Sequence, residues 1–437
     1  MHKRMIALSL VVVACIVFSM SIVAQNDKNM IRSFADEHSI NAYSIAFYNG
    51  AKPLEFMNTN GITEDTVYEV GSNGKMIVAY IALKLVDEGK ISLDTKIYPF
   101  LKEEFITDDV RLQKIAVGQL LSHTGGFSPS YELGIDKKIY FEPGTRFQYS
   151  GVGYIYLQSV IENITGLSIE DVAKEYVFTP LGMNHSTFES ATTVTPYMRS
   201  SSAVLYCLLV FLVSLLALLV VGVILKRTIK GKEISLRLIF LIAFTASSVI
   251  NLTFLLIYFV SKVAVLFVIY ACVAIFILFL TRKKAKLMYI GFSGYTILFI
   301  VLGLLLNITI PVTNDLVPRE ANAAYSLKST SHDMALFCEE LLEKSSDHDS
   351  AVQDMFLPAV VIDGQNSWGL GIAIENTAQG LTYWHSGINP GFQSLVVLYP
   401  SNNSYIVILT NSDDGLDFAK KTSTVLLNID GTWDIKR

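Results

Sequence analysis

The sequence has 437 residues, of which 51% are hydrophobic and 17% are charged, and its formal net charge at neutral pH is −5. This acidic balance excludes a protein that binds nucleic acid through a basic surface. Three of the four cysteines, Cys15, Cys207 and Cys272, lie in apolar runs, so neither a disulfide framework nor a cysteine metal site is expected around Cys338.

The first 24 residues have the features of an export signal. His2, Lys3 and Arg4 precede an apolar run from Met5 to Ala24, which matches the charged and hydrophobic regions of a signal peptide. Cleavage after Ala24 is one outcome, and retention of the run as an anchor is another. Lipidation at Cys15 is a third alternative, which the apolar residues beyond it disfavour. Residues 25–200 are then exported.

The first exported segment predicts a hairpin followed by a helix. Ala42–Tyr48 and the stretch that ends near Phe56 read as two strands, and Asn49-Gly50 between them is typical of a type I′ turn. Apolar residues then recur at helical spacing from Ser72 until Gly89, which predicts a helix with these two residues as its start and stop signals.

The start of that helix carries the main chemical signal. A spacing of three residues places the Ser72 hydroxyl and the Lys75 ammonium on one helical face, one turn apart. Burial and the positive helix N-terminus favour a lysine that has lost its proton and can accept that of serine. Backbone N–H groups at the same terminus can stabilise an oxyanion. Alone, the pattern also fits a helix cap followed by an exposed lysine.

A block of apolar sequence interrupts the exported part of the chain. A helix needs about 20 apolar residues to cross a bilayer. Four stretches within residues 201–312 approach this length, and we expect transmembrane helices over 203–225, 238–260, 263–280 and 288–310.

Charges between these stretches predict their orientation. Ten of the 34 Lys and Arg residues but only one acid, Glu233, lie in residues 200–312. The first and third connections are basic and the second holds only Lys262, so the first and third face the cytoplasm. Both long flanking segments, 25–200 and 313–437, then lie outside the cell and can form one domain. The prediction is a multi-pass protein of the cell membrane with an extracytoplasmic domain.

The segment after the block predicts a helix, a strand meander and a closing helix. The first helix is expected over Ser331–Lys344. Alternating and β-branched residues then indicate strands, and a final helix follows at Asp417–Asn428; the expected strands are Gly369–Glu375, Leu381–His385, Phe392–Tyr399 and Tyr405–Asn411. With the N-terminal hairpin, these strands favour a sheet built from both chain ends.

Further motifs accompany Ser72 and Lys75 in a specific order: Leu120 to Gly126, Phe141 to Gly144, Phe147 to Ser150, and Trp384 to Gly387. Together they resemble the serine β-lactamase-like hydrolases, in the branch that contains class C β-lactamases, DD-peptidases and esterases. The resemblance covers about residues 40–190 and 320–425. It implies an α/β (α+β) fold with an antiparallel sheet and an all-helical subregion.

The resemblance also implies roles for individual residues. Ser72 matches the acylated nucleophile, Lys75 its proton partner and Tyr149 the tyrosine base. The family places a substrate-steadying asparagine two positions after that tyrosine, where this sequence has Gly151. A packed aromatic with no catalytic role is the alternative for Tyr149.

His385, Ser386 and Gly387 match the family's third motif, whose strand lies along the substrate. The resemblance places the oxyanion hole at the backbone N–H groups of Ser72 and Ile388. An ordinary strand histidine is the alternative for His385. His123 is expected to be structural.

These assignments predict a serine hydrolase that works through an acyl-enzyme without a metal or an organic cofactor. The expected partners are the lipid bilayer and a small-molecule or peptidoglycan-like substrate with a peptide, amide or ester bond. Gly151 favours an esterase or D-amino-acid peptidase over an efficient β-lactamase. The alternative is a non-catalytic penicillin-binding or sensor-type membrane protein. A transporter is disfavoured because the apolar stretches lack central ionisable residues.

The position of the apolar block makes one geometric prediction. The chain leaves the domain after residues 181–188 and returns at residues 325–333. If one domain is formed from both sides, these two segments must be neighbours.

Overall fold

The computed structural model describes residues 28–129 other than 52 and 60, residues 138–199, 309–311 and 320–435. The chain divides into two compact units, Met1–Val194 with Arg319–Arg437, and Thr195–Pro318. Among the described residues, no helix is both long and apolar enough to cross a membrane. The predicted leader and the four predicted spans lie outside the described residues, except for residues 309 and 310, which belong to a short strand.

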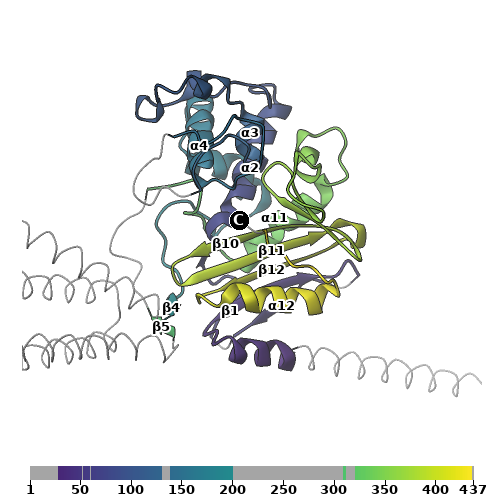
Figure 1. Cartoon of the computed structure of the whole chain (residues 1–437). Helices are drawn as coiled ribbons and strands as arrows, with labels where there is room; N and C mark the ends of the chain where they lie inside the picture. The colour runs from purple at the N-terminus through teal and green to yellow at the C-terminus, as the bar shows by residue number, and fades with distance from the viewer. Residues whose placement is uncertain are drawn as a thin grey trace, which may run out of the picture. The chain divides into compact units, whose positions relative to one another are not determined.

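The first unit is built on one antiparallel sheet of eight strands (Figure 1), in the order β2-β1-β12-β11-β10-β9-β8-β7. The N-terminal strand β1 pairs with the last strand β12, with Tyr43 opposite Thr410. A sheet built from both chain ends is therefore confirmed. Its strands are β1 (Tyr43–Tyr48), β2 (Glu55–Asn58), β7 (Val360–Val361), β8 (Asn366–Trp368), β9 (Ala373–Thr377), β10 (Gly380–Asn389), β11 (Phe392–Tyr399) and β12 (Ser404–Thr410).

Consecutive apolar residues in the strands point to opposite faces of this sheet, and helices cover both faces. In β12, Ile406 and Ile408 belong to one apolar cluster, while Val407 and Leu409 belong to the other. Helix α12 (Gly415–Leu427) joins the first cluster and lies along the sheet in Figure 1. Helices α2 (Gly74–Asp87) and α11 (Ser331–Lys344) join the second. Burial of this kind contributes about 25 cal/mol per Å² of apolar surface.

The described residues between 71 and 181 form the expected helical subregion (Figure 1), in which α2 packs with two helices from residues 117–165. Besides α2, its helices are α3 (Val117–Leu121), α4 (Gly151–Thr165), α5 (Ile169–Ala173) and α6 (Thr179–Leu181). Short turns complete the unit: η1 (Gly71–Asn73), η2 (Tyr98–Phe100), η3 (Glu103–Phe105), η4 (Val110–Lys114), η5 (Lys174–Phe178), η6 (Ala351–Phe356) and η7 (Pro400–Asn402).

Two local predictions were wrong. Pairing of β1 with β2 begins at Phe47 opposite Glu55, so a longer connection replaces the type I′ turn. Pro53 cannot donate a ladder hydrogen bond, and Gly50 lies against the backbone of residues 402 and 403. Strand β9 begins at Ala373 rather than Gly369, because Gly371 has a positive φ of 92°.

The two segments that flank the predicted membrane block are neighbours, as expected. Thr187 and Lys328 exchange backbone hydrogen bonds of 3.0 and 2.8 Å. Strands β3 (Tyr68–Glu69) and β6 (Lys328–Ser329) pair beside them. Within the second unit, β4 (Tyr197–Arg199) pairs with β5 (Thr309–Pro311), so that the two ends of this unit also meet.

The C-terminal tail is held by a buried carboxylate in β9. Glu375 is 2% exposed. Its carboxylate accepts hydrogen bonds from the backbone N–H groups of Thr432 at 2.7 Å and Trp433 at 2.8 Å, and from the Thr432 hydroxyl at 2.9 Å. The Trp433 side chain is 1% exposed. Residues 432 and 433 are therefore part of the folded unit.

Replacement of this carboxylate should loosen the tail. We expect Glu375→Gln to lower the free energy of unfolding by about 1–2 kcal/mol, because an amide replaces a charged acceptor of three hydrogen bonds. Urea unfolding of the full chain, followed by tryptophan fluorescence, measures the change. The control is Glu37→Gln at an exposed carboxylate. Equal midpoints for the two variants would contradict the expectation.

Candidate active site

The predicted nucleophile lies in the tight turn η1, between β3 and α2. Gly71 has a φ of +54°, and a Cβ atom there would lie 2.9 Å from the backbone nitrogen of Ile388. The Ser394 hydroxyl donates to the Val70 carbonyl at 2.9 Å and accepts from the Asn73 amide at 2.7 Å. The turn that presents the half-buried Ser72 is thus fixed against β10 and β11.

Lys75 lies in the first turn of α2 and is 1% exposed. Its Nζ donates to the Ser72 Oγ at 2.9 Å and also to the Ala324 carbonyl. The same nitrogen lies 5.1 Å from the ring centroid of Tyr149 and 5.6 Å from that of Tyr154. The fold therefore brings Tyr149, which is distant in sequence, to Ser72 and Lys75.

Burial raises the pKa of Tyr154 well above its ordinary value, and Tyr149 adds to the rise. Tyr154 therefore remains protonated at neutral pH. Tyr154 is fully buried, and its ring lies 5.6 Å from Lys75 Nζ, so it forms a wall of the site.

His123 packs against the Tyr149 ring and contacts the residue that follows it. Its Nδ1 accepts the backbone N–H of Ser150 at 3.1 Å, and its ring centroid lies 4.4 Å from that of Tyr149. The Ser150 hydroxyl in turn caps α4 by accepting the Gly153 N–H at 2.9 Å. This arrangement agrees with the structural role expected for His123.

The third motif lies on β10 beside the nucleophile turn. Strand β9 pairs with β10 only as far as Trp384, so His385 to Asn389 have no β9 partner among the described strands. A Cβ at Gly387 would lie 1.9 Å from the Val70 carbonyl, so glycine is required for this approach. The backbone N–H groups of Ser72 and Ile388 consequently lie on adjoining segments.

His385 itself is 2% exposed, and its Nδ1 lies 2.9 Å from the Ser386 carbonyl oxygen. Its ring centroid is 6.0 Å from that of Tyr149. Ser386 is half-buried and Ile388 is 52% exposed. The strand thus presents a partly open edge next to Tyr149.

Gly151 is the first residue of α4, and its N–H donates to the Pro129 carbonyl at 3.0 Å. It offers no side chain to the site. A backbone group that sequence reasoning missed, the Ala324 carbonyl, accepts from Lys75. Gln158 holds the segment around it through Ala321 and Ala323, at 3.2 and 2.9 Å.

The end of β10 also contributes to this segment. The Asn389 amide donates to the Glu69 carboxylate at 2.6 Å and to the Tyr325 carbonyl at 3.2 Å. Because Tyr325 follows Ala324 directly, Asn389 and Gln158 fix the acceptor of Lys75 from two sides.

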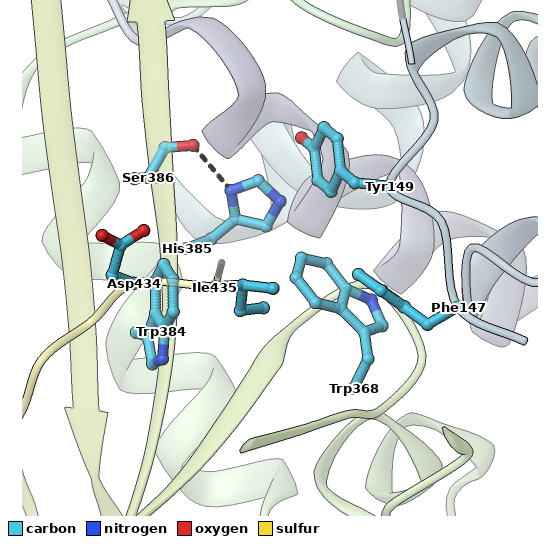
Figure 2. A pocket seen from close by; sticks show the side chains of 8 residues that line it. All are labelled: Phe147, Tyr149, Trp368, Trp384, His385, Ser386, Asp434 and Ile435. Carbon is cyan, nitrogen blue, oxygen red and sulfur yellow. Dashed lines mark hydrogen bonds between the residues drawn. The ribbon is translucent and has the colours of Figure 1, made fainter. Parts of the chain in front are cut away.

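A second feature missed from the sequence is an aromatic pocket next to Tyr149 and His385. Figure 2 shows Phe147, Tyr149 and Trp368 on one side, Trp384, Ser386 and Asp434 on the other, and His385 and Ile435 between them. Aromatic residues close to the motifs were the available signal, but their shared pocket depends on the fold. Among the described residues, no group of three or more His, Cys, Asp or Glu is placed to hold a metal ion.

Comparison with known proteins agrees with this geometry. The beta-lactamase family model matches residues 28–203 and 307–430, well over half of the chain. Penicillin-binding protein 4 of Amycolatopsis lactamdurans is 31% identical over 140 residues, which are 29% of this chain and 37% of that protein. The chain spans about a third of the length of the curated relatives that it matches, at 37% and 35% for two of them.

Solved structures share the fold. A beta-lactamase/D-alanine carboxypeptidase from Pseudomonas syringae aligns with a TM-score of 0.57 and 16% identity, over 92% of this chain and 98% of that one. A D-stereospecific amidohydrolase from a Streptomyces species aligns with the same score and identity, over 91% and 96%. With a matching family model and the same fold, the chain belongs to the beta-lactamase family of serine hydrolases.

Proposed function

We propose that this protein is a membrane-bound, extracytoplasmic serine hydrolase that forms an acyl-enzyme at Ser72. The contact that carries the proposal is the 2.9 Å hydrogen bond between Lys75 Nζ and Ser72 Oγ, with the Tyr149 ring against the same nitrogen. A nucleophile within reach of its proton acceptor is the arrangement that covalent catalysis requires.

The proposed reaction has two steps. In the first, the Lys75 and Tyr149 pair accepts the Ser72 proton while Oγ attacks the substrate carbonyl carbon. The oxyanion accepts hydrogen bonds from the backbone N–H groups of Ser72 and Ile388. The bond to the leaving group then breaks, and the leaving group takes the proton. In the second step, the same groups take a proton from the water that attacks the Ser72 ester. The bond between Ser72 Oγ and the acyl group then breaks, Oγ takes that proton back, and the acid product leaves.

Candidate substrates are peptides, amides and esters of the cell envelope. The relatives include a D-alanine carboxypeptidase and a D-stereospecific amidohydrolase. Without an amide side chain at Gly151, the site has one fewer group to hold a β-lactam. We therefore favour an esterase or a D-amino-acid peptidase.

The membrane location rests on the sequence. The leader over residues 1–24 and the four apolar stretches within 201–312 would place the hydrolase unit outside the cell and next to the bilayer. The two flanking segments meet at Thr187 and Lys328, so a block inserted there leaves the hydrolase fold intact.

Covalent labelling tests the proposal. The purified full chain is treated with a fluorophosphonate and with a fluorescent β-lactam, and intact mass is measured for the native protein and for Ser72→Ala. An adduct that disappears in Ser72→Ala supports the proposal, and the preferred probe separates an esterase-like site from a penicillin-recognising one. No Ser72-dependent adduct in folded protein would favour a non-catalytic sensor.

Removal of the Tyr149 hydroxyl should slow this chemistry. Tyr149→Phe keeps the ring that packs on His123 but loses the proton-transfer group. We expect kcat for an activated ester to fall by about 10²- to 10³-fold. Steady-state kinetics measures the change, with Tyr140→Phe at an exposed tyrosine as the control. An unchanged kcat would assign Tyr149 to packing alone.

A further inference from the structure

The C-terminal tail is a part of the site that the family match does not include. The match ends at residue 430, whereas the tail continues in defined positions through residue 435. The hydrogen bonds of Glu375 to Thr432 and Trp433 fix its path. The next two residues, Asp434 and Ile435, then reach the aromatic pocket.

Asp434 and Ile435 complete the pocket in different ways. Ile435 is partly buried and packs with the apolar cluster that contains Trp368 and Trp384. The Asp434 side chain is 67% exposed and pairs with Lys420 of α12 at 3.4 Å. Asp434 and Ser386 line the same side of the pocket in Figure 2. The tail thus supplies one apolar wall and one carboxylate.

The charge of the pocket follows from its lining. No lysine or arginine lines it in the described part of the chain, and Asp434 supplies its carboxylate. Lys75 lies beyond the Tyr149 ring, at 5.1 Å from the centroid, and Lys420 offsets part of the Asp434 charge. A substrate carboxylate entering this pocket would lose water without gaining a contact to a lysine or arginine of the described residues.

We propose that Asp434 and Ile435 determine specificity, by forming a subsite for an apolar or aromatic substrate group that carries no carboxylate. This inference refines the proposed hydrolase: its ester or amide substrates would present an uncharged or cationic apolar group next to the scissile bond. Aromatic walls bind such groups well, and cations also gain from the ring faces.

Tryptophan fluorescence gives a test that does not depend on turnover. The chain has three tryptophans, of which Trp368 and Trp384 line the pocket and Trp433 precedes its tail wall. The full-length Ser72→Ala protein is titrated with benzyl alcohol, benzylamine and phenylacetate. We expect phenylacetate to bind about three- to fivefold more weakly than benzyl alcohol, because its carboxylate is repelled by the Asp434 carboxylate, which solvent and Lys420 partly screen.

Variants assign this preference to the tail. Asp434→Asn should bring phenylacetate to the affinity of benzyl alcohol, while Asp430→Asn, with the same charge change at an exposed residue outside the lining, should not. Ile435→Phe should fill the pocket and weaken all three ligands, and Ile435→Ala should weaken them by loss of contact. Urea midpoints verify that each variant is folded.

The outcomes are separable from those of the proposed function. The absence of any Ser72-dependent fluorophosphonate adduct in the folded protein would count against the hydrolase, while these titrations would still report on the pocket. Phenylacetate binding as tightly as benzyl alcohol, or equal behaviour of Asp434→Asn and Asp430→Asn, would overturn the charge preference. Unchanged binding in both Ile435 variants would overturn the subsite.

Discussion

Replacement of Lys75 by methionine is expected to slow acylation of Ser72 by about 10³- to 10⁴-fold. Lys75 Nζ is the group that donates to Ser72 Oγ at 2.9 Å, and it also contacts the Ala324 carbonyl and the Tyr149 ring. Methionine fills a similar volume but can neither hold nor take the hydroxyl proton. Stopped-flow labelling with a fluorophosphonate measures the rate.

The same substitution should leave stability unchanged or raise it. Lys75 is 1% exposed, and a buried amino group has lost most of its hydration. A thioether avoids that cost, although the Ala324 carbonyl loses its donor. A fall in rate without a fall in the urea midpoint would show that Lys75 is retained for chemistry rather than for folding.

Lys84→Met provides the matched control, since Lys84 lies on the same helix α2 in its last turn. It should label at the native rate. A Lys75→Met protein that is folded and also labels at the native rate would remove Lys75 from the mechanism and leave Tyr149 as the candidate base.

The nucleophile and its proton partner could be predicted because helix geometry makes the prediction local. A spacing of three residues places Ser72 and Lys75 one turn apart wherever the helix lies, and the 2.9 Å contact agrees with this. The sheet was predictable for a similar reason. In β12 four apolar residues follow one another, Ile406 to Leu409, and their side chains enter the two apolar clusters in turn. Both faces of the strand are therefore covered.

Other parts of the site have no local signal. The carbonyl of Ala324 acts through the backbone, so its residue type says nothing about its contact with Lys75. The pocket unites Phe147, Trp368 and Ile435, which only the completed fold brings together. The β1–β2 connection could not be derived from Asn49 and Gly50, because the register also depends on residues 402 and 403 across the sheet.

The second large effect is expected at Asp333, which joins the two segments on either side of the predicted membrane block. Its carboxylate is 1% exposed and accepts the His185 N–H at 2.7 Å and the Ser186 hydroxyl at 2.8 Å. Asp333→Ala removes a charged acceptor and leaves buried donors unpaired. We expect the free energy of unfolding to fall by about 3 kcal/mol.

Asp347→Ala is the matched control, because this aspartate, whose side chain is 32% exposed, follows the same helix α11 and pairs with Lys344. Its urea midpoint should stay close to that of the native protein, since ion pairs at the surface contribute little. Similar midpoints for both variants would mean that the Thr187 and Lys328 backbone pairing holds the junction without Asp333.

The position of Asp333 also predicts a link between stability and chemistry. The segment that it anchors pairs with Lys328 and leads back to Ala324, the acceptor of Lys75. Loosening of this junction should therefore slow fluorophosphonate labelling even in conditions where the Asp333→Ala protein remains folded. A large loss of stability with a native labelling rate would instead show that Gln158 and Asn389 alone hold the Ala324 carbonyl in place.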